Sequence, residues 1–392
     1  MPVTRRSASP ATAGEVFALI RDGVATTRTE IRGLTGLSRT AVGSRISALA
    51  RRGLVSEGEE GPSTGGRPPA LVRFNADAGV VLSAAIGRSR TRLAVCDLAG
   101  DIHALTDMDS EIRIGPDDLM PDLVKRLGVL LDETGRPARD ILGVGVSLPG
   151  TVDQQRGCSL ASPVMSGWDG VPLEPYFRKL TPAPVVLDND TNVQALSERR
   201  SPLKIHDNVL LIKASTGLGA GIVAGGVLQR GALGAAGEFG HNKTAAAAGI
   251  PCRCGDTGCL EAIAGGWALV RTLQEQGRSV NHIRDVVELA NHGDSEVRRL
   301  LRESGRHVGE VIAPAVNLLN PEVLVVGGDM SGAYDVFVAG LRETLYGNAT
   351  ALATRYLQVV PSTYGDKAGN IGSAALVLEQ ILSADAIDAA LR

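Results

Sequence analysis

CRCGDTGCLE, residues 252–261, places three of the chain's five cysteines within eight positions. Two glycines in the stretch allow the chain to fold back, so that the third cysteine returns toward the first two. A histidine stands eleven positions before the first cysteine. Three thiolates and one imidazole fill the four positions of a tetrahedral zinc site, and a site filled by protein is structural rather than catalytic. The predicted zinc ligands are His241, Cys252, Cys254 and Cys259. The alternative is a group of unliganded thiols.

The chain as a whole has the composition of a soluble globular protein. Its 392 residues are enough for two or three domains, and 44% of them are hydrophobic against 21% charged. No apolar run reaches the ~18–20 residues of a membrane helix, and the first arginines precede no apolar segment of the kind found in signal peptides. Clustered cysteines are typical of metal binding in a reducing compartment. We expect a cytoplasmic protein without a membrane partner.

Charge is distributed unevenly along the chain. Residues 1–75 contain eleven arginines, no lysine and six acidic residues, so this segment carries +5, whereas the remainder carries −8. A basic head on an acidic body indicates a nucleic-acid contact in the head. A solvated surface without a partner would have the same composition, so the charge needs a structural motif beside it.

The basic segment has the pattern of a helix-turn-helix. Thr27 and Glu30 have the spacing of a capping box, which predicts a helix start, and Gly36 can adopt the backbone angles of the turn that follows. Ser38 is a favourable N-cap for the next helix. In that second helix the apolar residues share one face, and small polar residues occupy the other. The predicted buried stripe is Val42, Ile46 and Leu49.

The exposed face of the second helix carries the predicted DNA contacts. Side chains at its start reach base edges, short residues permit close approach, and later arginines pair with phosphates. Two strand-like segments follow it with EGPSTGGRPP between them, which predicts a winged helix. The predicted DNA-contacting residues are Arg39, Thr40, Ser44, Arg45, Arg51 and Arg52, with Arg67 in the wing. Glu57 would repel phosphate if it faced the DNA. The alternative is a three-helix unit that docks to protein.

Residues 76–392 alternate between strand-like and helix-like segments, with glycine-rich turns after the strands. This alternation predicts an α/β architecture. In VVLDNDTNVQALSE, residues 185–198, a strand is expected to end at Leu187 and to deliver Asn189 and Asp190 to a loop before a helix. An amide and a carboxylate there suit the hydroxyls of a polyol, and the carboxylate can accept a proton. Helix capping is the alternative for this stretch.

A second glycine-rich turn lies in KASTGLGAGIVAGG, residues 213–226. Such a turn exposes backbone N–H groups that can bind a phosphate. Glycine-rich hairpins without any ligand are common, so this turn is informative only together with the other motifs.

These motifs together resemble the ROK family of repressors, open reading frames and sugar kinases. The resemblance covers nearly the whole chain. It rests on the segment from Gly237 to CRCGDTGCLE, on DNDTN (188–192), on STGLGAGI, on NPEVLVVGGDMS (320–331), and on VSLPG and GWDGVPL. STGGRPPALVRFN after a winged helix is typical of the repressor branch of that family.

The resemblance implies an actin-like, two-lobed sugar kinase fold that follows the winged helix-turn-helix, with the sugar in the cleft. It also implies that His241 binds metal with one ring nitrogen and faces the sugar with the other, so that the metal fixes the loop of the pocket. The implied sugar-binding residues are Asn189, Asp190, Glu238, His241 and Glu261. The expected domains are 1–75 for the winged helix-turn-helix, 76–190 with 366–392 for the smaller lobe, and 191–365 for the larger lobe, which carries the zinc loop and an oligomerisation surface.

One motif departs from the family pattern. Family kinases begin with a strand ending in Asp-x-Gly-(Gly or Ala)-Thr, which serves the phosphates of Mg-ATP, whereas this chain has AAIGRSRT at 84–91. Ala85 replaces the carboxylate, and Arg88 replaces a small residue. Phosphoryl transfer needs a held metal and a closely approached phosphate. We therefore predict that ATP and Mg²⁺ are not bound, that the chain is not an enzyme, and that Asp190 is a vestigial base retained as a sugar ligand.

The leading hypothesis is a sugar-responsive transcriptional regulator, a repressor of carbohydrate-metabolism genes, that binds a double-stranded operator as a homodimer or homotetramer. The second hypothesis is an active hexose kinase with a DNA-binding head. A third is a repressor whose pocket is vestigial or takes a phosphorylated ligand at Arg88 and Arg90.

Overall fold

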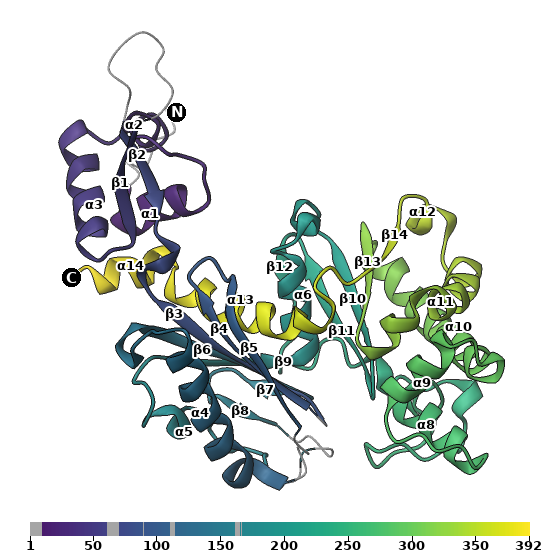
Figure 1. Cartoon of the computed structure of the whole chain (residues 1–392). Coiled ribbons are helices and arrows are strands. Elements are labelled where there is room, and N and C mark those ends of the chain that lie inside the picture. Colours follow the sequence, from purple (N-terminus) through teal and green to yellow (C-terminus); the bar gives the residue numbers. More distant parts are fainter. Residues whose placement is uncertain (1–9, 61–69, 89, 110–113, 161–164, 166) are drawn as a thin grey trace.

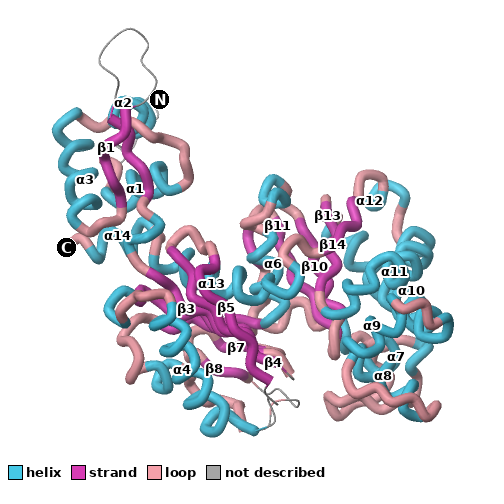
Figure 2. Tube along the Cα trace, in the orientation of Figure 1, coloured by secondary structure: helices cyan, strands magenta, loops and turns pink. Residues whose placement is uncertain are grey.

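A small head and two larger halves make up the molecule, and each half is built on a β-sheet with helices against it (Figures 1 and 2). The structure is a computed structural model. It describes residues 10–60, 70–88, 90–109, 114–160, 165 and 167–392. No helix in these ranges combines the length and the apolar character needed to cross a bilayer.

In its described residues, 10–60 and 70–75, the head contains three helices and a two-stranded antiparallel sheet. They are α1 (Ala13–Arg21), α2 (Arg28–Thr35), α3 (Arg39–Arg51), β1 (Val55–Glu60) and β2 (Ala70–Phe74). Thr27 and Glu30 form the expected capping box, and Gly36 has the left-handed φ of 68° that ends α2. Ser38 caps α3, whose apolar stripe is buried. The elements of the head therefore lie where the sequence predicts them.

Both halves contain a five-stranded mixed sheet with the same plan. The first has the order β5 (Ile102–Asp109), β4 (Arg90–Asp97), β3 (Val80–Ile86), β6 (Ile141–Leu148) and β9 (Val185–Asn189). The second has the order β12 (Val227–Leu228), β11 (Leu218–Ala224), β10 (Val209–Ala214), β13 (Val323–Gly327) and β14 (Gln358–Pro361). In each, three consecutive strands form an antiparallel meander, and the first of them also pairs in parallel with a later strand. This repeat is the plan of the actin-like fold expected from the sequence.

Helices on both faces explain why the central strands are continuously apolar. Strand β3 is buried along nearly its whole length, between α4 (Gly115–Glu133) and α13 (Ala368–Ile381). The second sheet packs against the helical layer that includes α10 (Ser295–Leu319) and α11 (Tyr334–Asn348). Each half thus has its own apolar core.

Two helices connect the halves. Helices α6 (Asp190–Glu198) and α13 pack so closely that a Cβ at Gly372 would lie 1.7 Å from the Val193 carbonyl oxygen. The chain continues from α13 into α14 (Ala384–Ala390), on which the head rests (Figure 1). The Gly14 N–H donates to Asp388 Oδ1 at 2.8 Å across this contact. The C-terminal helices therefore run from the space between the sheets to the head.

One local expectation is wrong. Strand β9 does not end at Leu187 but continues to Asn189, and α6 begins at Asp190 without an intervening loop. The physical reason is the N-cap, because Asn189 Oδ1 accepts from the N–H groups of Thr191 and Asn192 and lets the strand pass directly into the helix.

Candidate metal and sugar site

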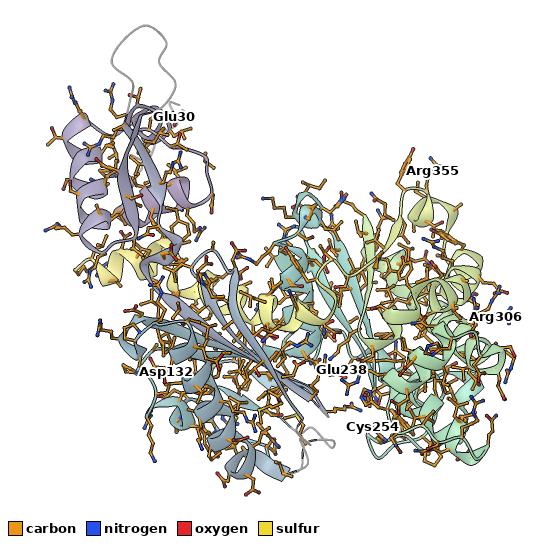
Figure 3. All side chains as sticks on the ribbon, in the orientation of Figure 1. Glu30, Asp132, Glu238, Cys254, Arg306 and Arg355 are labelled. Atoms are coloured by element: carbon orange, nitrogen blue, oxygen red, sulfur yellow. The ribbon has the colours of Figure 1, made fainter. Side chains whose placement is uncertain are left out.

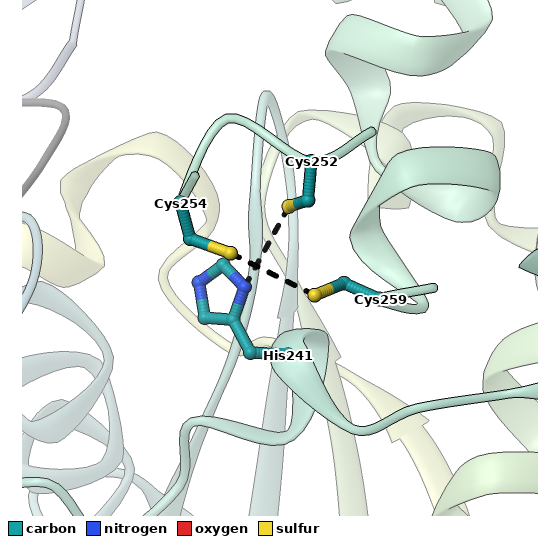
Figure 4. A group of neighbouring side chains, drawn as sticks. All are labelled: His241, Cys252, Cys254 and Cys259. Atoms are coloured by element: carbon teal, nitrogen blue, oxygen red, sulfur yellow. Dashed lines mark hydrogen bonds between the residues drawn. The ribbon is translucent and has the colours of Figure 1, made fainter. Parts of the chain in front are cut away.

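The four predicted metal ligands come together in one group (Figure 4). Their ligand atoms all lie within 4.8 Å of one another. His241 Nδ1 is 3.8 Å from Cys252 Sγ, and Cys254 Sγ is 3.7 Å from Cys259 Sγ. In a tetrahedral zinc site with Zn–S bonds of ~2.3 Å, two sulfur ligands are about 3.8 Å apart. The group therefore has the spacing to hold one tetrahedral metal ion.

A lysine outside the predicted ligand set supports residues 241–259, the metal loop, which contains all four predicted ligands. Lys243 pairs through its backbone with Cys259, and its ammonium donates to Cys259 Sγ at 3.3 Å and to Asp256 Oδ2 at 2.6 Å. The ammonium of Lys243 therefore lies directly against one of the predicted metal ligands. This contact could have been expected from the sequence, because Lys243 stands two positions after the predicted ligand His241.

His241 faces two ways. Its Nδ1 points to the sulfurs, and its Nε2 lies 3.8 Å from Glu238 Oε2. Glu238 and Cys254 both line the space between the two halves, and Figure 3 labels them there. Burial raises the pKa of the Glu238 carboxyl. The metal loop and the neighbouring cleft thus share one imidazole.

A cleft of about 840 Å³ lies between the two halves. It is lined by all five residues predicted to bind sugar: Asn189, Asp190, Glu238, His241 and Glu261. They come from the β9–α6 junction, from the turn before the metal loop, and from α7 (Glu261–Ala264). The volume falls in the ~300–1,000 Å³ range of small-molecule pockets, so the cleft is large enough for a monosaccharide.

The first pair of these residues is already engaged within the protein. Asn189 caps α6 with its Oδ1 and donates from Nδ2 to the Gly150 carbonyl at 2.8 Å. Asp190 forms an ion pair with Lys213, whose Nζ lies 2.5 Å from Asp190 Oδ2. Both polar side-chain atoms of Asn189 therefore have partners within the protein, and its Oδ1 acts as the N-cap of α6. Asp190 presents its carboxylate to the cleft beside Lys213, a residue that was not predicted from the sequence.

Glu261 is enclosed by protein donors. Its side chain is 2% exposed, Oε2 accepts from the Leu218 N–H at 2.9 Å, and Oε1 accepts from Trp267 Nε1 at 3.1 Å. Arg88 Nη1 stands 3.8 Å from Oε1. The hydrogen bond from Trp267 to Glu261 could not be predicted from the sequence motifs, because it depends on how the helix after α7 packs.

The phosphate side of the same cleft is occupied by a side chain. Ala85, Gly87 and Arg88 line it opposite the glycine-rich turn. A Cβ at Gly217 in that turn would lie 3.0 Å from Arg88 Nη2, so the guanidinium covers the backbone that a phosphate would approach. The structure thus brings Arg88 of the AAIGRSRT segment directly against Gly217 of the glycine-rich turn.

The next two arginines along the chain have carboxylate partners. Arg90 and Arg92 pair with Asp366 at 3.1 and 3.4 Å, and Arg92 also pairs with Asp107 at 2.6 Å. The hydrogen bond from Arg92 holds the pKa of Asp107 below its usual value. Because Arg90 already pairs with a carboxylate, it does not support the hypothesis that the pocket takes a phosphorylated ligand.

Helix α3 presents most of the predicted DNA-contacting residues to solvent: Arg39, Thr40, Ser44 and Arg51. Arg45 is half-buried, and its Nε donates to the Ala11 carbonyl at 2.6 Å. Arg67 lies outside the described residues. Glu57, which would repel phosphate, instead accepts two hydrogen bonds from Arg28 Nη2 at 2.7 and 2.9 Å.

Arg52 at the end of α3 points to the body of the protein. One of its Nη groups donates to the Ala390 carbonyl of α14. The end of α3 therefore faces α14, while Arg52 remains exposed, and its phosphate contact stays a prediction.

Known proteins resemble the chain in two ways. A putative xylose repressor from Caldicellulosiruptor sp. (strain Rt8B.4) is 30% identical over 386 residues, which cover 94% of this chain and 95% of that protein. The crystal structure of a ROK family transcriptional regulator, a homolog of the E. coli MLC protein, superposes with a TM-score of 0.80 at 26% identity and covers 97% of this chain and 98% of its own.

A kinase matches a smaller part. A ROK family glucokinase from Streptomyces griseus, solved with glucose and AMPPNP, has a TM-score of 0.66 at 28% identity; the match covers 99% of the kinase but 76% of this chain. The model of the ROK family matches residues 81–380, which include both sheets, the cleft and the metal loop. From these residues and from the repressor-length relatives it follows that the chain belongs to the ROK family.

Proposed function

We propose that this protein is a sugar-responsive, DNA-binding transcriptional regulator that represses genes of carbohydrate metabolism. The observation that carries the proposal is that a head with the helix-turn-helix pattern packs through α1 on α14 of a body with the sugar-kinase fold. Relatives that span the head are named repressors or transcriptional regulators, and the glucokinase match accounts for the body alone.

The head supplies the DNA side of the proposal. Two exposed residues at the start of α3, Arg39 and Thr40, would read base edges in the major groove, and Arg51 would contact phosphate. Because Arg45 Nε donates to the Ala11 carbonyl, Arg45 would contact DNA only through its Nη groups. The exposure and the basic charge of this face support the proposal.

The cleft supplies the sugar side. Carboxylates accept from sugar hydroxyls, as Asp190 and Glu238 would do here. The Nε2–H of His241, whose Nδ1 faces the sulfurs, would donate to a hydroxyl. We propose zinc as the ion of the metal loop, because three thiolates and one imidazole are a typical zinc ligand set. The ion would act structurally and would fix His241 and the chain around it.

Catalysis is not part of the proposed function. The position of the metal-binding Asp is Ala85, and Arg88 covers the glycine turn. Asp190 is then a sugar ligand and not a working base. The second candidate is an active hexose kinase, which the glucokinase resemblance and Asp190 favour. ATP turnover with a hexose would support that candidate.

The C-terminal helices offer a route between the two sites. Asp366 at the cleft precedes α13, α13 packs against β3, β6 and α6, and α14 supports the head. A sugar that prefers one arrangement of the two halves would therefore move the head through α13 and α14. We retain the division into a head (1–75), a smaller lobe (76–190 and 366–392) and a larger lobe (191–365) as part of this proposal.

We also propose a homodimer or homotetramer, because helix-turn-helix proteins read two half-sites with two heads. The larger lobe has exposed apolar residues that an interface could cover. Leu318 is 85% exposed, Leu352 is 73% exposed and Tyr356 is 84% exposed, at the end of α10 and around α12 (Ala351–Thr354).

The test is fluorescence anisotropy of labelled DNA from the region upstream of the protein's own gene. The salt concentration is fixed, because phosphate contacts make affinity depend on it. D-xylose, D-glucose and N-acetyl-D-glucosamine are added in turn. The proposal expects specific binding that at least one sugar changes; binding no tighter than to random DNA would contradict it.

A further inference from the structure

Glu261 is the most enclosed of the three carboxylates that are predicted to bind sugar. Its side chain is 2% exposed, against 16% for Asp190 and 39% for Glu238. A buried charge is unfavourable unless hydrogen bonds compensate it. Two neutral donors do so here: the Leu218 N–H at Oε2 and Trp267 Nε1 at Oε1. The lone pairs that these donors leave are the ones available to a sugar hydroxyl.

A competing partner stands beside this carboxylate. Arg88 Nη1 lies 3.8 Å from Glu261 Oε1, which is too far for a hydrogen bond. Among the described residues this buried nitrogen has no hydrogen-bond acceptor. A small rotation of Glu261 toward Arg88 would let Arg88 Nη1 donate a hydrogen bond to the carboxylate. The same rotation would turn the carboxylate away from its present direction. The indole N–H opposes that rotation, because it holds Oε1 from another side.

The indole itself is fixed by the metal loop. Arg253, which stands between two metal ligands, has its Cζ 4.6 Å from the centre of the Trp267 ring, and Arg271 has its Cζ 4.9 Å from it. Both distances are typical of cation–π contacts. Trp267 also belongs to the apolar cluster that contains Cys252 and Cys259. Its position therefore depends on the fold of the loop.

We infer that Trp267, in α8 (Gly266–Glu275), is a positioning residue of the sugar pocket: it keeps Glu261 directed at the ligand and away from Arg88. The inference rests on the proposed sugar binding and adds the residue through which the metal loop acts on the pocket. Loss of the metal then weakens sugar binding because Arg253 and Trp267 lose their support.

Trp267→Phe tests this inference, since phenylalanine keeps an aromatic ring and removes the N–H. A hydrogen bond to a charged group contributes enough that we expect sugar affinity to fall about tenfold. The affinity for DNA without sugar and the zinc content should stay as in the wild type. Binding of D-xylose, D-glucose and N-acetyl-D-glucosamine is measured by calorimetry on the full chain.

A double-mutant cycle separates positioning from general damage to the fold. If Trp267 acts through Glu261, Trp267→Phe should have no further effect on sugar affinity in a Glu261→Ala background. An undiminished effect in that background would overturn the inference, as would a Trp267→Phe protein with wild-type sugar affinity.

Fluorescence gives a readout that needs no variant of the pocket. The chain has two tryptophans, so Trp168→Phe leaves Trp267 as the reporter. A sugar that engages Glu261 should change its emission, and a sugar that binds by calorimetry without any such change would speak against the inference. If none of the three sugars binds the wild type or alters its DNA binding, the proposed function fails, and the inference fails with it.

Discussion

Gly14→Ala tests whether the head senses the body through its contact with α14. Gly14 is buried in α1, and a Cβ there would lie 2.0 Å from the Ala384 carbonyl oxygen. Because Cβ contacts under 3.0 Å essentially never occur, the two helices must separate by about 1 Å or more. Neither the exposed face of α3 nor the cleft is altered by the change.

The cost follows from the clash. Overpacking of this kind typically costs about 1–3 kcal/mol, which lowers the ratio of docked to undocked heads by about 5- to 150-fold. Alanine also favours a helix over glycine by ~1 kcal/mol. Because α1 is helical in docked and undocked heads alike, this gain leaves the docking ratio unchanged. Gly33→Ala in α2 provides the matched control, because a Cβ at Gly33 meets no atom within 4 Å.

The assay is the ratio of DNA affinities without and with sugar. We expect this ratio to move toward one in Gly14→Ala and to stay at the wild-type value in Gly33→Ala. Limited proteolysis between head and body should be faster for the first variant alone. If both variants show the wild-type sugar response, the route through α14 is refuted.

Three further predictions concern the metal, the DNA and the phosphate side. Cys259→Ser should lose zinc and, with it, sugar response, whereas Cys158→Ser should keep both, because Cys158 lies outside the metal group; zinc content and anisotropy check this. Arg39→Ala should weaken operator binding by ~1–3 kcal/mol with less effect on random DNA, as measured by anisotropy at fixed salt. Ala85→Asp combined with Arg88→Gly should open the glycine turn and raise ATP binding, which calorimetry with Mg-ATP detects.

Each of these predictions has a result that would contradict it. Normal sugar affinity in a zinc-free protein would separate the metal from the pocket. An equal loss on operator and random DNA would assign Arg39 to phosphate contact rather than to base reading. ATP turnover by the unmodified chain would restore the kinase hypothesis, whatever the double variant does.

The metal group was predictable because its ligands are close in sequence and chemically distinctive. The spacing of three cysteines and a histidine limits the geometry, and the structure brings all four together. The helices of the head were also predictable, because Thr27, Gly36 and Ser38 mark helix ends through contacts within one helical turn.

Features that depend on packing between distant segments were not predictable. The sequence could not indicate that Arg88 would lie against Gly217 and beside Glu261, because these residues come from different halves of the molecule. Nor could it show that Arg52 would contact α14, which is formed by the last residues of the chain. Asn189 is an intermediate case, since its two candidate roles, ligand and cap, involve the same side chain.

The most direct test of the central claim is anisotropy of the labelled upstream DNA at fixed salt, with and without D-xylose, D-glucose and N-acetyl-D-glucosamine. A sugar-responsive regulator should bind this DNA specifically as the wild type and should change its affinity with at least one of these sugars. Specific binding that no sugar alters would contradict the sugar response, and the absence of specific binding would contradict the regulatory role of the head.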